Sequence, residues 1–305
     1  MVGNFDGVHR GHRWVLEQGL AQAEAAGLDP IVLTFHPHPS EVLGRGGLPV
    51  LTVLERKVDL LARLSPRLRV VVEPFTRELA GASPGEFARD LLRDALGAKR
   101  VIVGQNFRFG RGRSGDFATL RTLGEELGFE ARAEALHADP SGVISSTRIR
   151  ELISTGAVAA AESLLGRPHA LSGVVRTGDG RARQLGVPSA NLGEVAELLP
   201  ANGVYAVLVD VLEPHGFRTL GRGITNVGVR PTHGAGDVRA ETHVLDFTGD
   251  LYGRTIRVHL VDRLRDERRF AGLDELVAQL GRDKADGAAR LASREPDPEA
   301  QGAWH

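Results

Sequence analysis

The sequence GNFDGVHRGH at positions 3–12 decides the fold of the first half of the chain. It leads into a helical pattern over residues 12–26, and His9 and His12 share a face if the helix begins here. Gly11 removes a side chain where a phosphate would approach, and a helix N-terminus supplies free N–H groups and a positive dipole end. We interpret the segment as a phosphate-binding strand-to-helix turn of an α/β domain, with a metal site or surface histidines as the alternative.

Outward from this turn, strand and helix patterns alternate as far as residue 165. Such alternation is typical of a parallel sheet covered by helices on both faces. The sharpest helix start is Ser83 followed by Pro84, because it joins an N-cap residue to a proline at the first helical position. The predicted strands are 31–35, 69–75, 100–103 and 129–136, and the further predicted helices are 54–64, 84–96, 116–127, 147–154 and 157–165.

The pattern changes at Gly166-Arg167-Pro168, where we place the domain boundary. Strand patterns between turns of Gly, Pro, Asn and Asp then favour an antiparallel barrel or sandwich. An amphipathic helix is predicted over 273–291, and the tail is expected to fray. The predicted strands are 170–176, 204–211, 218–227, 239–247 and 256–264. The predicted domains are therefore residues 1–166 and 167–292, followed by a tail over 293–305.

Composition limits the classes of function. A length of 305 residues favours two domains, and the absence of cysteine excludes disulfides, thiolate metal sites and cysteine nucleophiles. The net charge of −1, from 38 basic and 39 acidic residues, argues against a nucleic-acid partner, and no apolar run is long enough for a membrane span. We expect a cytoplasmic protein. Lys57, Lys99 and Lys284 are the only lysines; the arginines suit phosphate contacts but also follow from a biased composition.

Three further segments of the first half carry chemistry. TFHPHP at 34–39 follows a predicted strand, at the edge where open α/β sheets bind ligands. VGQNFRFG at 103–110 also follows a strand and places aromatic rings and an arginine in a loop, where a flat ring could stack. ISSTRIR at 144–150 combines hydroxyls, arginines and a helix start, which suits a phosphate. Taken alone, this last segment is most simply a capped helix.

The second half holds a weaker constellation. The glycines of GVVRTGDGR at 173–181 allow a backbone turn whose N–H groups face a phosphate. Ser189 and Asn191 are two residues apart, so they point the same way in an extended segment, and their oxygens suit Mg²⁺. The alternative is a glycine turn followed by a structural asparagine. Glu241 is a carboxylate inside a strand pattern, for which the alternative is a solvated, outward-facing side chain.

These segments together resemble the family of bacterial bifunctional riboflavin kinase/FMN adenylyltransferases, also called FAD synthetases. The resemblance covers about residues 1–292 and rests on GNFDGVHRGH, TFHPHP, VGQNFRFG and ISSTRIR, with PSAN at 188–191 in the second half. It implies an α/β nucleotidyltransferase domain with a Rossmann-like parallel sheet. An antiparallel six-stranded β-barrel riboflavin kinase domain with a C-terminal helix would follow.

For the first domain, the resemblance implies transfer of the adenylyl group of ATP to FMN, which yields FAD and pyrophosphate. His9 and His12 would be the catalytic pair that holds the ATP phosphates. The expected ATP contacts are Gly11, Ser146, Thr147 and Arg150. The expected lining of the flavin cleft is Asn4, Asp6, His36 and Asn106. Positioning together with charge stabilisation by Mg²⁺, His and Arg would suffice, without a protein nucleophile.

For the second domain, the resemblance implies transfer of the ATP γ-phosphate to riboflavin, which yields FMN. Ser189 and Asn191 would bind Mg·ATP, with ATP contacts at Gly178 and Arg181, and Glu241 would take the proton from the riboflavin 5′-hydroxyl. Two residues depart from the family pattern. Ser189 replaces the threonine of P-T-A-N but keeps its hydroxyl, so we expect Mg²⁺ binding to persist. Ala182 stands where family members usually carry glycine, and a positive φ there would disturb the ATP loop.

The start of the chain departs as well. Only Met1 and Val2 precede Gly3, although the phosphate loop of an α/β sheet ordinarily follows a strand of about five residues. We expect a true start further upstream or a weakened first domain. The alternatives are that one activity alone is retained, or that the protein binds flavin without turnover. The expected partners are riboflavin, FMN and ATP, with no nucleic acid or membrane, in a monomer or weak homo-oligomer.

Overall fold

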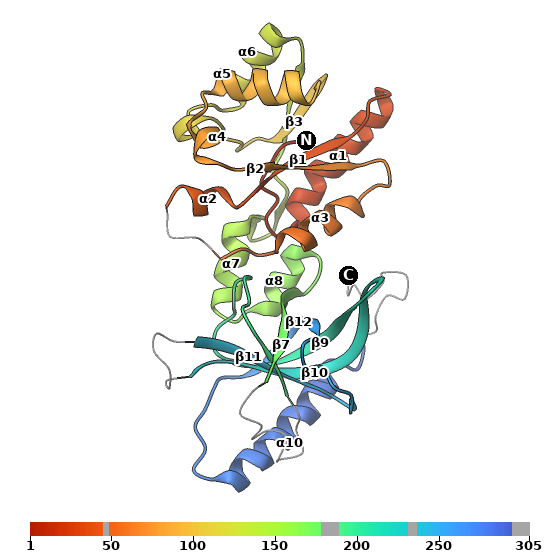
Figure 1. Cartoon of the computed structure of the whole chain (residues 1–305), viewed down its shortest axis with the longest axis vertical. Coiled ribbons are helices and arrows are strands. Elements are labelled where there is room, and N and C mark those ends of the chain that lie inside the picture. The colour runs from red at the N-terminus through yellow and green to blue at the C-terminus, as the bar shows by residue number, and fades with distance from the viewer. Residues whose placement is uncertain (45–48, 178–188, 231–236, 295–305) are drawn as a thin grey trace. The chain divides into compact units, whose positions relative to one another are not determined.

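The computed structural model describes residues 1–44, 49–177, 189–230 and 237–294 (Figure 1). The chain forms two compact units, Met1–Ser146 and Thr147–His305. The division falls about twenty residues before the boundary expected at 166/167, which stays a prediction. In the part of the chain that the structure describes, no helix combines the length and the apolar character that a membrane span requires.

The first unit is built on parallel strands. β1 (Ile31–His36) pairs with β2 (Arg69–Pro74), and β3 (Arg100–Gly104) pairs with β4 (Glu130–Glu134), both in parallel. The first residues of the chain join the two pairs, because the Val2 N–H donates to the Ile102 carbonyl at 3.1 Å and the Gly3 N–H donates to the Leu33 carbonyl at 3.1 Å. Met1–Gly3 therefore occupy a strand position between β1 and β3.

Helices cover both faces of this sheet, as predicted. Alternate residues of β1 enter different clusters: Val32 packs with Leu16 and Leu61, whereas Leu33 packs with Phe87 and Leu120. A strand buried on both faces is the mark of a covered parallel sheet. The helices are α1 (Arg10–Ala25), α2 (Pro39–Val42), α3 (Leu54–Ala62), α4 (Arg77–Gly81), α5 (Pro84–Glu86) and α6 (Phe117–Leu127).

The predicted helix start at Ser83 is confirmed. The Ser83 hydroxyl accepts from the Glu86 N–H, and the Glu86 carboxylate accepts from the Ser83 N–H, which forms a capping box. After α5 the chain continues as wider π-helical turns over Phe87–Ala95. A short 3₁₀ turn follows at Arg111–Arg113. A hairpin of β5 (Ala138–Asp139) and β6 (Gly142–Val143), which the sequence did not predict, precedes the second unit.

The second unit contains a closed barrel, which decides between the barrel and the sandwich. Two helices precede it, α7 (Ser146–Ser154) and α8 (Val158–Leu165). The strand order is β10-β11-β8-β7-β12-β9, with antiparallel pairs. The strands are β7 (His169–Arg176), β8 (Ala190–Leu192), β9 (Gly203–Glu213), β10 (Gly216–Arg230), β11 (Asp237–Val244) and β12 (Thr255–Arg265). The short strand β8 is the one barrel strand that the sequence patterns missed.

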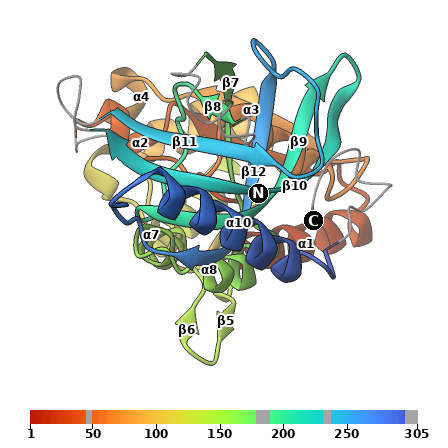
Figure 2. The ribbon, with the colours of Figure 1, turned by 90° about the horizontal axis from the view of Figure 1, so that it is seen from below.

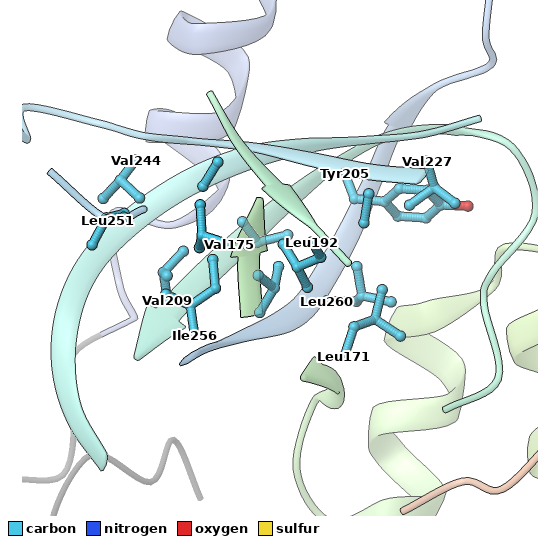
Figure 3. Close-up of a cluster of buried hydrophobic side chains, with 14 of the residues drawn as sticks. Leu171, Val175, Leu192, Tyr205, Val209, Val227, Val244, Leu251, Ile256 and Leu260 are labelled. Atoms are coloured by element: carbon cyan, nitrogen blue, oxygen red, sulfur yellow. The ribbon is translucent and has the colours of Figure 1, made fainter. Parts of the chain in front are cut away.

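Alternation along the strands fills the barrel. Figure 3 shows Val175, Leu192, Tyr205 and Val227 among the side chains of this core. The opposite face of β9 packs elsewhere: Ala206 and Leu208 join a second cluster with Val261 and Leu291. The C-terminal helix α10 (Leu273–Arg290) lies along the outside of the barrel beside β10 (Figure 2). Arg265 of β12 holds it with a two-pronged ion pair to Asp283, at 2.7 and 2.9 Å.

Candidate active sites

The turn at positions 3–12 is held in an unusual backbone conformation. Phe5, Gly7 and Val8 have φ angles of 49°, 86° and 39°. For Phe5 and β-branched Val8, such angles cost about 1–3 kcal/mol each. The surrounding contacts offset this cost, because both side chains are buried in one cluster and the Val8 N–H donates to the Phe5 carbonyl at 3.0 Å. Strain of this kind is concentrated where a loop must present side chains in a fixed geometry.

The two histidines of the turn lie against each other. The rings of His9 and His12 stack with centroids 3.5 Å apart and an angle of 17°. His9 is the N-cap of α1, and its Nδ1 accepts from the His12 N–H at 3.2 Å. A ring nitrogen that accepts carries no proton, so the proton of a neutral His9 ring lies on Nε2. The structure thus brings the predicted catalytic pair together at the start of a helix.

Gly11 is required by close packing. A Cβ at this position would lie 3.0 Å from the Ile144 carbonyl oxygen and 3.1 Å from His9 Nδ1. The bare glycine lets the segment around Ile144 approach α1 directly. At the end of that segment, the Ser146 hydroxyl donates to the Asp6 carbonyl at 2.9 Å. The predicted residue Ser146 therefore lies beside the turn at positions 3–12, which holds Gly11 and is called the histidine turn below. A phosphate contact at either residue stays a prediction.

Asp6 has a structural role in the turn. Its side chain is 4% exposed, and its carboxylate oxygens accept from the backbone N–H groups of Leu51 and Thr52 at 3.0–3.2 Å. These bonds fasten the segment before α3 to the turn. A flavin contact from Asp6 stays a prediction. No local pattern indicates this anchoring, because 45 residues separate Asp6 from Leu51.

Three further predicted residues end neighbouring strands. His36 is the last residue of β1, and Asn106 lies two residues after the end of β3. Both side chains are exposed. The Asn4 side chain is also exposed, while its carbonyl accepts from the Thr34 hydroxyl at 3.0 Å. Their contact with flavin stays a prediction. The aromatic rings near Asn106 do not form an open platform, because Phe109 is buried and stacks on Phe107 at 5.5 Å.

Some predicted nucleotide contacts lie outside the first unit. Thr147 and Arg150 are on α7, in the first turns of the second unit. Gly178 and Arg181 lie outside the described residues, and so does the departure at Ala182. For all of these, the role in ATP binding stays a prediction.

The candidate kinase residues form a row across the barrel. Glu241 of β11 lies opposite Asn191 of β8, and Asn191 lies opposite Arg176 of β7. Asn226 of β10 lies opposite Glu241 on the other side. Residues paired in this way point to the same face of a sheet, and their neighbours fill the core, so the row faces outward. Ser189 immediately precedes β8.

Asn191 has a feature that fits a cation ligand. The side chain is 8% exposed, and its Oδ1 is buried without a hydrogen-bond partner among the described residues. A buried acceptor left in this state is costly, which suggests that a ligand completes it. An amide oxygen is a hard donor of the type that Mg²⁺ takes, and the adjacent Ser189 hydroxyl is another. Within the described ranges, no cluster of three or more His, Asp or Glu side chains could hold a metal.

Sequence reasoning missed two residues of these regions. Asn226 falls within the predicted strand 218–227 and was assigned no role, although its register places it beside Glu241. Lys57 was counted as one of the few lysines, yet its Nζ donates to the Phe35 carbonyl at 3.0 Å and the Asn4 carbonyl at 3.4 Å. Its scarcity in an arginine-rich chain was the available signal.

Two family models match separate parts of the chain. The family model of FAD synthetase matches residues 1–148, and the family model of riboflavin kinase matches residues 165–291. A bifunctional riboflavin kinase/FMN adenylyltransferase of Escherichia coli K12 is 41% identical over 284 residues, which cover 93% of this chain and 89% of that protein. Its counterpart from Pseudomonas fluorescens is 37% identical, with 95% and 92% covered.

A solved structure matches over both units. A protein of Streptococcus pneumoniae, described as a macrolide-efflux protein, is 30% identical, with a TM-score of 0.81 and coverage of 93% of this chain and 91% of that one. The match shows that the two share a fold. The efflux named in that description is a statement about the pneumococcal protein.

Proposed function

Because this chain belongs to the bifunctional riboflavin kinase/FMN adenylyltransferase family, we propose that its two units divide the two reactions between them. The protein phosphorylates riboflavin to FMN with ATP and adenylylates FMN to FAD. We assign the first step to the barrel and the second to the α/β unit. The observation that carries the assignment is that each unit holds its own set of reactive side chains: the His9–His12 stack in one, the Asn191–Glu241 row in the other.

In the kinase step, Glu241 would act as the base. It accepts the proton of the riboflavin 5′-hydroxyl while that oxygen bonds to the γ-phosphorus of ATP and the bond from this phosphorus to the bridging oxygen breaks. The outward-facing row places the carboxylate of Glu241 on the same face as Asn191. Asn191 and Ser189 would hold Mg²⁺, which supplies charge neutralisation of the ATP phosphates when bound. The Oδ1 of Asn191, which is buried without a hydrogen-bond partner among the described residues, supports this assignment.

In the adenylyl-transfer step, an oxygen of the FMN phosphate bonds to the α-phosphorus of ATP and pyrophosphate leaves. No covalent intermediate with the protein is needed, so positioning and charge stabilisation carry the catalysis. His9 and His12 would hold the phosphates at the start of α1, with Nε2 of His9 as the N–H donor. Gly11, Ser146, Thr147 and Arg150 would contact the same nucleotide, while Asn4, Asp6, His36 and Asn106 would line the flavin cleft.

The decisive experiment supplies the two flavins separately. The full chain is incubated with ATP and Mg²⁺ and either riboflavin or FMN, and the products are separated by chromatography. Both FMN and FAD are expected from riboflavin, and FAD from FMN. If FAD forms from FMN but riboflavin yields neither FMN nor FAD, the kinase assignment is wrong. Flavin binding without consumption of ATP would replace both reactions by a non-catalytic role.

The metal proposal has a separate test. Removal of divalent cations with a chelator should stop both reactions, and Mg²⁺ should restore them. Asn191→Ala should raise the Mg²⁺ concentration that half-saturates FMN formation by about tenfold or more, because a ligand oxygen is lost. The Mg²⁺ dependence of FAD formation from FMN should stay unchanged in that variant. An unaltered Mg²⁺ requirement for FMN formation would contradict the assignment.

A further inference from the structure

The side chain of Lys57 contacts the backbone of the histidine turn in the first unit. It is 7% exposed and belongs to the buried face of α3, together with Leu60 and Leu61. Its ammonium donates to the carbonyls of Phe35 and Asn4, at 3.0 and 3.4 Å. Phe35 precedes the exposed His36 at the end of β1, and Asn4 belongs to the turn that follows the Met1–Gly3 strand. The side chain therefore ties together two strand ends at the edge where α/β sheets bind ligands.

The positive charge of Lys57 is destabilised by burial. Burial lowers the pKa of Lys57 below its ordinary value, and the carboxylate of Asp6 opposes that change. The carboxylate of Asp6 also accepts hydrogen bonds from the N–H groups of Leu51 and Thr52, so Lys57 is not its sole partner. A neutral donor could join two carbonyls without the desolvation of a charge. A buried ammonium at a strand end is instead typical of a site where negative charge arrives.

The hydrogen-bonding capacity of the ammonium points the same way. Lysine has three N–H donors, and among the described residues two acceptors are present, the carbonyls of Phe35 and Asn4. An anionic oxygen would take the third donor and provide the counter-charge together. A compact ammonium fits between two fixed carbonyls and a third acceptor, whereas the flat guanidinium of arginine has its donors in one plane. This difference explains a lysine at this position in an arginine-rich chain.

We propose that Lys57 is a further substrate-binding residue of the adenylyltransferase site: it fixes two strand ends through their carbonyls and gives its third N–H to a substrate phosphate oxygen. This proposal rests on the adenylyl-transfer function of the first unit. Both substrates carry such an oxygen, the triphosphate of ATP and the phosphate of FMN. The kinetics of each substrate distinguish these two sources.

The test compares three substitutions of Lys57 with one control in the full chain. Lys57→Met keeps the length and removes the charge and the donors, Lys57→Gln keeps a neutral donor, and Lys57→Arg keeps the charge. Lys99→Met is the matched control, because Lys99 is an exposed lysine of the same unit. FAD formation from FMN is measured at varied ATP and at varied FMN. FMN formation from riboflavin by the barrel serves as the internal reference for a folded, active chain.

Lys57→Met is expected to lower kcat/KM for FAD formation by about 10- to 100-fold, the usual loss for a charge-assisted hydrogen bond. A raised KM for ATP assigns the contact to the triphosphate, and a raised KM for FMN assigns it to the flavin phosphate. FMN formation should be unchanged in every variant, and Lys99→Met should match the wild type. Kinetics of Lys57→Met within twofold of the wild type would overturn the proposal.

Two further outcomes distinguish a structural role of Lys57 from a role in substrate binding. A loss of kcat with both KM values unchanged, accompanied by a lower melting temperature, would mean that Lys57 only supports the fold. If Lys57→Met does not fold, the comparison moves to the other two variants. Lys57→Arg should then exceed Lys57→Gln at least tenfold in FAD formation, because the positive charge is retained, and equal activities would overturn the proposal. A wild-type chain that makes no FAD from FMN contradicts the proposed function itself.

Discussion

His169 gives the barrel a defined sensitivity to acid. It is the first residue of β7, lies opposite Leu260 of β12, and is 2% exposed. Its Nε2 donates to the Leu198 carbonyl at 2.8 Å. Burial lowers the pKa of His169 from 6.5 to about 4; the positive charges of Arg167 and His259 act in the same direction, and the bond to Leu198 opposes them. The ring is therefore neutral in the folded protein above about pH 4.

The size and sign of the effect follow from these two pKa values. The unfolded chain takes up a proton near pH 6.5, while the folded chain does so only near pH 4. Above pH 6.5 the ring is neutral in both states and contributes no pH dependence. Between pH 6.5 and 4 only the unfolded state is protonated, so stability is lost as the pH falls. A gap of about 2.5 between the pKa values corresponds to a loss of about 3 kcal/mol, complete near pH 4.

The assay measures unfolding of the wild type and of His169→Gln by urea between pH 7.5 and pH 4. Glutamine retains an N–H donor for the Leu198 carbonyl but does not titrate. The wild type should lose about 3 kcal/mol more than the variant across this interval. His215→Gln, which removes an exposed histidine of the same unit, should follow the wild type. Equal pH slopes for the wild type and His169→Gln, or an imidazole NMR signal of His169 that titrates near pH 6.5, would refute the reasoning.

Three substitutions test the two sites. Glu241→Gln removes the proposed base and should lower FMN formation by about 100-fold or more while FAD formation from FMN continues, and an active variant would reassign the base. Ser189→Thr adds a methyl group that restricts the hydroxyl rotamer, so the kinase rate at limiting Mg²⁺ should rise, whereas a fall would show that the serine is adapted to its surroundings. Gly11→Ala places a Cβ 3.0 Å from the Ile144 carbonyl oxygen and 3.1 Å from His9 Nδ1, so FAD formation should fall at least tenfold with the kinase rate unchanged, and full activity would mean that the turn relaxes freely.

Much of the fold follows from local sequence. The N-cap at Ser83 and the helix that begins beside His9 involve residues close together in the chain, and both were predicted. The exposed or buried state of a site residue was harder to predict. The sequence did not indicate that the Asp6 carboxylate accepts from the N–H groups of Leu51 and Thr52, and its place in a flavin cleft stays a prediction. The aromatic loop near Asn106 was assigned to ring stacking with a ligand, yet Phe109 belongs to the core.

The barrel shows where sequence patterns end. Strand β8 has only three residues, Ala190–Leu192, too few for alternation to stand out. Its place in the sheet comes from pairing with β7 and β11, and this pairing sets Asn191 opposite Glu241. The register of strands so distant in sequence depends on which faces are buried, and a shift of β8 by one residue would turn Asn191 into the core, away from Glu241.

The sequence by itself determined the two kinds of domain, the helix starts and the types of side chain available for phosphate chemistry, because these depend on interactions between near neighbours. The tertiary structure decided which of those side chains meet. It placed Glu241 beside Asn191 and bonded the Asp6 carboxylate to the N–H of Leu51. It also joined Lys57 to the carbonyls of Asn4 and Phe35. These contacts span from about twenty to about fifty residues. Their formation depends on burial and hydrogen-bond satisfaction in the folded chain, which no local pattern encodes.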